Sequence, residues 1–190
     1  FSLEDFLIKT HNEFLVISDV AGSGKTTLLR KIHEILMEES SEHFIIFISL
    51  LKYVDELTEG VGDNFTEFIA RILNFDALEK EVFEQKYSKG EVKILFDGFD
   101  EISPICKENT TKLFQNFKHN DDNQIFITTR THLEHDLEKS LNVLAHRIKI
   151  LTKEEQIQFV VEFWENDDRF LVKKCAELLV DIISRIFRSN

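Results

Sequence analysis

A short glycine-containing stretch offers the clearest chemistry in this sequence. Residues 18–27 read Ser-Asp-Val-Ala-Gly-Ser-Gly-Lys-Thr-Thr. The glycines at 22 and 24 let the backbone take left-handed angles, so that successive N–H groups can surround an anion. A lysine in this position reaches the β- and γ-phosphates of a nucleotide, and the next hydroxyl ligates Mg²⁺. We therefore expect a phosphate-binding loop formed by Ala21, Gly22, Ser23, Gly24, Lys25, Thr26 and Thr27.

One position departs from the usual pattern of such a loop, G-x-x-x-x-G-K-[ST]. The first glycine of the pattern is replaced by Asp19. We expect this carboxylate to lie on the side of the phosphates and to weaken binding by repulsion. The opposing interpretation is that Asp19 accepts a hydrogen bond from a loop N–H, as aspartate does in turns.

A second set of chemical groups follows the apolar run Val92-Lys93-Ile94-Leu95-Phe96. The run ends at Asp97, and Asp100 and Glu101 come shortly after it. In open α/β folds ligands bind at the carboxyl ends of the strands. We expect Asp97 to hold Mg²⁺ through water opposite Thr26, and either Asp100 or Glu101 to polarise the attacking water.

A third group lies at the end of another apolar run, Gln124 to Thr129, which is followed by Arg130. If this strand ends at the same edge of the sheet, Arg130 can hydrogen-bond the γ-phosphate. We therefore predict Asp100, Glu101 and Arg130 as catalytic residues and Thr26 and Asp97 as metal-binding residues.

Alternating strand and helix patterns position these groups. Short apolar runs predict strands at 13–18, 43–50, 124–129 and 146–151, together with the strand that ends at Asp97. Helical periodicity is found over 1–12, 27–37, 52–89, 107–117, 153–164 and 168–187. The motif Thr152-Lys153-Glu154-Glu155 predicts a capping box at the start of helix 153–164.

Length, net charge and composition limit the class of protein and the partners that fit this sequence. The 190 residues suffice for one domain and the start of another, and the helical pattern near residue 187 suggests a piece of a longer polypeptide. The net charge of −12 argues against a nucleic-acid partner. The sequence shows neither a membrane span nor a signal peptide, and two cysteines make no disulfide framework. We therefore expect a cytoplasmic protein.

Taken together, three motifs resemble those of the NACHT nucleotide-binding domains of the STAND class of P-loop NTPases, the group that contains the NOD-like receptors. They are Ala21-Gly22-Ser23-Gly24-Lys25-Thr26, then Leu95-Phe96-Asp97-Gly98-Phe99-Asp100-Glu101, then Ile127-Thr128-Thr129-Arg130. The resemblance covers roughly residues 13–165, and it implies a three-layer α/β fold with a five-stranded parallel sheet in the order 5-1-4-3-2. Residues 1–151 would form this domain, and residues 152–190 the beginning of a helical subdomain.

The resemblance also implies a function. It indicates a molecular switch in innate immune signalling that binds ATP or ADP with Mg²⁺, hydrolyses ATP slowly and controls self-association, with protein partners bound by domains outside this chain. Two alternatives stay open: a small-molecule or nucleoside kinase, and a non-catalytic nucleotide-binding scaffold. The chain lacks the Asn-Lys-x-Asp guanine motif, although this does not decide between ATP and GTP.

Overall fold

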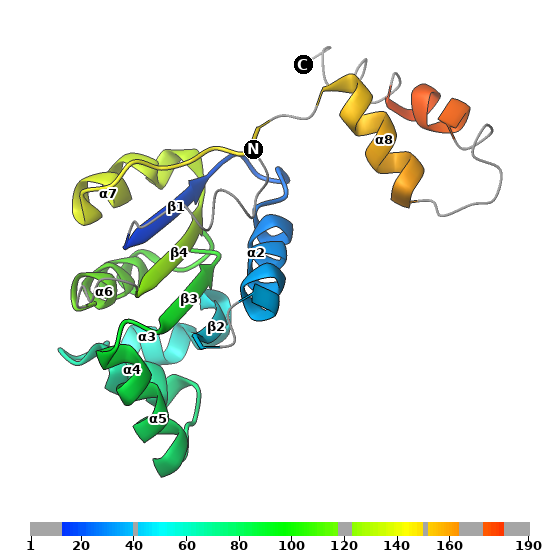
Figure 1. Ribbon diagram of the computed structural model, residues 1–190. Helices are drawn as coiled ribbons and strands as arrows, with labels where there is room; N and C mark the ends of the chain where they lie inside the picture. Colours follow the sequence, from blue (N-terminus) through cyan, green and yellow to red (C-terminus); the bar gives the residue numbers. More distant parts are fainter. Residues whose placement is uncertain (1–12, 40–41, 118–122, 150–151, 164–172, 181–190) are drawn as a thin grey trace. The chain divides into compact units, whose positions relative to one another are not determined.

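The computed structural model describes residues 13–39, 42–117, 123–149, 152–163 and 173–180 (Figure 1). The chain separates into two compact units, residues 1–148 and residues 149–190, and each is described by itself. The predicted helix over residues 1–12 and most of the predicted helix 168–187 lie outside the described residues.

A parallel sheet forms the centre of the first unit. Its strands are β1 (Phe14–Ser18), β2 (Phe44–Ser49), β3 (Val92–Asp97) and β4 (Gln124–Thr129). Every pairing is parallel, and the order is β1-β4-β3-β2. All residues of β1 and β4 are buried, as expected for strands covered on both faces. Parallel pairing places the carboxyl ends of all four strands at one edge.

Helices cover both faces of the sheet and give three layers (Figure 1). Helix α2 (Lys25–Glu39) packs on one face, where Leu29, Ile32 and Leu36 contact Leu15 and Phe126. The helices of the other face share one large core with the sheet. They are α3 (Val54–Glu59), α4 (Phe65–Ile72), α5 (Ala77–Ser88), α6 (Pro104–Gln115) and α7 (Thr131–Leu141), and the 3-10 turn η1 (Leu50–Tyr53) precedes α3.

Aromatic packing fixes the end of β3. The rings of Phe96 and Phe114 lie edge to face with centroids 5.0 Å apart, and both side chains are fully buried. Helix α6 begins three residues earlier than predicted, because Pro104 is its first residue and the Ser103 hydroxyl accepts a hydrogen bond from the Cys106 N–H. Strand β3 and helix α6 therefore hold the turn that contains Asp100 and Glu101 between them.

The predicted fifth strand, 146–151, is not formed among the described residues. The described sheet has four strands instead of the expected five, and its order β1-β4-β3-β2 is the expected order 5-1-4-3-2 without the fifth strand. Of the described residues 146–149, only His146 pairs with β1, through a parallel bridge to Ile17. Beyond it the Arg147 side chain turns to Glu134 (Nη2–Oε1 3.2 Å), and the first unit ends at residue 148. Residues 146–148 thus form a connecting segment that the His146 bridge and the Arg147–Glu134 ion pair hold to the rest of the first unit.

The second unit contains helix α8 (Lys153–Phe163) and a helical segment over residues 173–180. The predicted capping box is confirmed. The Glu155 N–H donates to Thr152 Oγ1 (3.2 Å), and the Thr152 N–H donates to Glu155 Oε2 (2.7 Å). Among the helices that the structure describes, none has the length and apolar character needed to span a membrane.

Candidate nucleotide-binding site

The loop between β1 and α2 has the conformation expected of an anion site. Both of its glycines have positive φ, +76° at Gly22 and +90° at Gly24, which other residues rarely adopt. Neither glycine has an atom within 4 Å of the position that a Cβ would occupy. Helix α2 begins at Lys25, directly after the loop, so its positive N-terminal end adds to the field at the loop.

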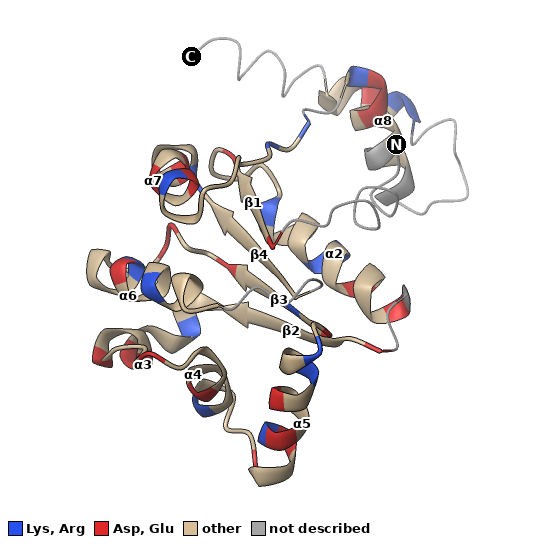
Figure 2. Ribbon diagram, turned by 60° about the vertical axis from the view of Figure 1, so that its left-hand side comes forward, with Lys and Arg blue, Asp and Glu red and all other residues tan. Residues whose placement is uncertain are grey.

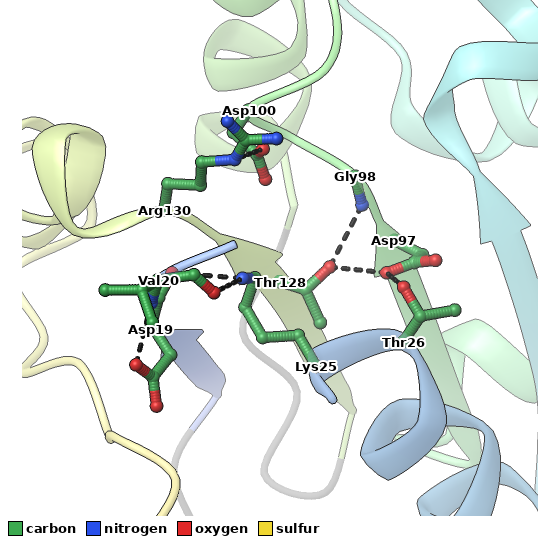
Figure 3. A network of polar contacts seen from close by, with 9 residues as sticks. All are labelled: Asp19, Val20, Lys25, Thr26, Asp97, Gly98, Asp100, Thr128 and Arg130. Atoms are coloured by element: carbon green, nitrogen blue, oxygen red, sulfur yellow. Dashed lines mark hydrogen bonds and ion pairs between the residues drawn. The ribbon is translucent and has the colours of Figure 1, made fainter. Parts of the chain in front are cut away.

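The side chain of Lys25 folds back over this loop. Its Nζ donates to the carbonyl oxygens of Val20 (2.7 Å) and Asp19 (3.0 Å). The ammonium group is therefore held at the mouth of the loop by neutral acceptors (Figure 3). A phosphate oxygen would be a stronger partner for the same donors, because it carries charge.

The carboxylate of Asp19 does not line the cleft at this edge of the sheet. Its Oδ1 accepts a hydrogen bond from the Val20 N–H (2.7 Å), and the Asp19 N–H donates to the carbonyl of Thr129 (3.3 Å). Figure 3 shows the carboxylate directed away from Thr26 and Asp97. The expectation that it faces the phosphates is therefore wrong in this structure, and the alternative, a cap on a loop N–H, is what the geometry shows.

The loop and the end of β3 meet at the Asp97 carboxylate. Thr26 Oγ1 donates to Asp97 Oδ1 (3.1 Å), although the two residues are 71 positions apart in the sequence. The same oxygen also accepts from Thr128 Oγ1 (2.6 Å) at the end of β4. Hydroxyl and carboxylate oxygens are the ligands that Mg²⁺ prefers, so this donor set fits that ion.

The turn after β3 brings a carboxylate and a guanidinium together. Arg130 Nε lies 2.6 Å from Asp100 Oδ2, and the side chain of Asp100 is only 5% exposed, whereas that of Arg130 is 46% exposed. Glu101 is exposed, and its Oε2 lies 3.3 Å from the position that a Cβ on Gly98 would occupy. The ion pair occupies Asp100 and leaves Glu101 open to solvent.

These residues surround one cleft of about 330 Å³. It is lined by every predicted site residue except Ser23, and by two residues that the sequence analysis did not include, Gly98 and Thr128. The contact between Thr128 and Asp97 was missed because it depends on the register of β3 against β4. That register pairs Phe96 with Ile127 and so places the following residues, Asp97 and Thr128, side by side.

Comparison with known families agrees with this geometry. A family model for the NACHT domain matches residues 13–167. The chain belongs to the NACHT family. This is a family of P-loop NTPase domains, which implies a nucleotide and usually Mg²⁺. The residues that line the cleft fit both. The resemblance noted from the three motifs is thereby confirmed.

Solved structures share the fold of this NACHT domain at low sequence identity. A DNA replication initiation factor has a TM-score of 0.57 at 12% identity, with 97% of this chain and 57% of that chain covered. Domain III of the Thermotoga maritima replication initiation protein DnaA has a TM-score of 0.56 at 15% identity, with 86% and 68% covered.

A third structure, replication initiator DnaA bound to AMPPCP and single-stranded DNA, has a TM-score of 0.53 at 15% identity, with 95% of this chain and 58% of that chain covered. The NACHT chain thus spans little more than half the length of two of these proteins. The likeness shows an α/β P-loop NTPase-like fold. Comparison with curated proteins gives no match.

Proposed function

We propose that this domain is a nucleotide-dependent switch that binds ATP and ADP with Mg²⁺ and hydrolyses ATP slowly. The observation that carries the proposal is the hydrogen bond from Thr26 Oγ1 to Asp97 Oδ1 (3.1 Å), beside a loop with two positive-φ glycines. This hydrogen bond requires that a phosphate loop and a strand ending in an acidic residue lie at the same edge of one parallel sheet. The groups that would form the two halves of an Mg²⁺–nucleotide site lie together without any rearrangement of the strands.

In this proposal the loop residues Ala21 to Thr27 bind the phosphates through their N–H groups, and Lys25 exchanges its two carbonyl partners for phosphate oxygens. Thr26 and Asp97 would hold the Mg²⁺ ion. When bound, the ion would neutralise negative charge that develops on the phosphate oxygens. Arg130 would contact the γ-phosphate after leaving Asp100.

We assign the role of general base to Glu101. A general base needs a carboxylate that is free to accept a proton from water. Asp100 has a guanidinium at 2.6 Å, which occupies one of its oxygens. Glu101 is exposed at the same cleft and follows the positive-φ Gly98 (φ +84°) by three residues. Asp100 then acts by holding Arg130.

The wider role is carried over from the NACHT domains that the chain resembles. Residues 1–151 would be the nucleotide-binding domain and residues 152–190 the start of a helical subdomain, in a cytoplasmic signalling protein that self-associates under nucleotide control. A nucleic-acid partner is disfavoured by the net charge of −12. Figure 2 shows basic residues spread over α2, α5, α6 and α7 and interspersed with acidic ones.

The proposal is tested by calorimetric titration of the chain with ADP and with the ATP analogue AMPPCP, each in Mg²⁺. Lys25→Ala removes the one mobile charge of the loop, and the loss of a charge-assisted contact costs about 1.5–3 kcal/mol, or roughly ten- to hundredfold in affinity. Lys31→Ala, on an exposed part of α2 where Lys31 pairs with Glu34, is the matched control. Equal affinity in both variants would refute the assignment of the loop.

Hydrolysis separates the remaining alternatives. Slow release of phosphate from ATP alone supports a switch ATPase, whereas turnover that needs a second phosphate acceptor would indicate a kinase. Binding without any turnover would select the non-catalytic scaffold.

A further inference from the structure

The hydroxyl group of Thr128 is buried where β3 ends, and it connects several parts of the candidate site. Its oxygen donates to Asp97 Oδ1 (2.6 Å) and accepts from the Gly98 N–H (2.9 Å). The carbonyl of Thr128 accepts from the Phe99 N–H (3.1 Å). One residue of β4, only 1% exposed, is thus bonded to three consecutive residues at the end of β3.

The two bonds of the hydroxyl determine where its proton lies. A backbone N–H only donates, so the Thr128 oxygen must accept from Gly98, and its single proton is then directed to the Asp97 carboxylate. A donor in this direction restricts the rotation of the Asp97 carboxylate. Figure 3 shows both threonine hydroxyls on the same oxygen of Asp97 and the other oxygen directed away from them.

We propose that Thr128 is a positioning residue that orients Asp97 for Mg²⁺, and therefore sets how strongly Mg²⁺ increases the affinity for a nucleotide. The inference rests on the proposed function. It goes beyond that function by naming a group that would act through Asp97. Residues that hydrogen-bond a metal ligand typically contribute about 10- to 100-fold to metal affinity.

The neighbouring residue provides a natural control. Thr129 is the same residue type on the same strand and is fully buried, but successive strand residues point to opposite faces of the sheet. Its hydroxyl has no hydrogen-bond partner among the described residues. Valine keeps the shape of threonine and removes the hydroxyl, so Thr128→Val and Thr129→Val differ in whether Asp97 loses a partner.

The experiment compares AMPPCP affinity in Mg²⁺ and in EDTA, by calorimetry, for the unaltered chain, Thr128→Val, Thr128→Ser and Thr129→Val. We expect Thr128→Val to weaken binding about 10- to 100-fold in Mg²⁺ and to leave the affinity in EDTA within about twofold. Thr128→Ser keeps the hydroxyl and should restore the Mg²⁺ dependence. Thr129→Val should behave like the unaltered chain. Thermal unfolding of each variant identifies any general loss of structure.

The outcomes are distinct. Two results would overturn the assignment, because both are expected if the threonine side chains act only by packing. One is an equal loss of AMPPCP affinity in Mg²⁺ and in EDTA for Thr128→Val. The other is an effect of Thr129→Val as large as that of Thr128→Val. Unchanged Mg²⁺ dependence in Thr128→Val would overturn it as well. If the unaltered chain binds no AMPPCP, the proposed function fails and this inference fails with it. If Thr128→Val does not fold, Thr128→Ala is measured in the same way.

Discussion

Replacing Asp100 by asparagine tests how the ion pair with Arg130 controls the cleft. The substitution keeps the size of the side chain and removes the charge opposite the guanidinium. At an effective dielectric of about 20, unit charges about 4 Å apart attract by about 4 kcal/mol. The Arg130 side chain is 46% exposed, so solvent screening and desolvation reduce the net value, to about 1–2 kcal/mol.

In the proposed function Arg130 must leave Asp100 before it reaches a γ-phosphate. Removing the competing charge should therefore tighten binding of AMPPCP, which has a γ-phosphate, by about five- to thirtyfold. Binding of ADP should be unchanged, because ADP lacks the group that Arg130 contacts. Calorimetric titration of Asp100→Asn with both nucleotides, at one Mg²⁺ concentration, measures the difference.

A double-mutant cycle isolates the contribution of the pair. In an Arg130→Ala background Asp100→Asn has no guanidinium to release, so the gain for AMPPCP should disappear. Weaker AMPPCP binding in Asp100→Asn, or the same gain with and without Arg130, would refute the reasoning. Either result would show that Asp100 acts on the nucleotide by another route.

Three further predictions concern the base, the turnover rate and the loop. Glu101→Gln should leave nucleotide affinity unchanged and slow phosphate release by about 10²- to 10⁴-fold. Asp100→Asn should slow phosphate release much less. If Asp100→Asn slows it more than Glu101→Gln does, Asp100 is the base. The unaltered chain should itself turn over ATP well below about 10 s⁻¹, a typical enzyme rate. Asp19→Asn keeps an acceptor for the Val20 N–H and removes a charge, so ADP should bind a few-fold more tightly, most clearly at low salt. Asp19→Gly loses that acceptor and should gain less, and a larger gain for glycine than for asparagine would show that the cap is unimportant.

The parts of the site that depend on local sequence could be predicted. Two glycines before a lysine and a helix specify the loop, and an apolar run ending in an acid places Asp97 at the edge of the sheet. Predicting these features requires only the direction of the chain and a parallel arrangement of the strands. The structure places both where the motifs require.

Features that depend on contacts between distant segments could not be predicted. The bond from Thr128 to Asp97 needs the register of β4 against β3, and the sequence spacing leaves this register undetermined. Residues 146–149 were predicted as part of a strand, yet of these four only His146 pairs with β1. The sequence also left the direction of the Asp19 carboxylate open, and the structure shows it bonded to the N–H of its own neighbour, Val20.

The bridge at His146 has a mechanical consequence for the loop. The His146 N–H donates to the Val16 carbonyl (2.7 Å), and the Ser18 N–H donates to the His146 carbonyl (2.8 Å). These two hydrogen bonds attach the outgoing chain to the end of β1, directly before the loop. Each such bond contributes only about 1 kcal/mol net. A pull on the chain beyond residue 148 would be transmitted through this bridge to Val16 and Ser18 of β1. The outgoing chain is thus attached directly to the strand that leads into the loop.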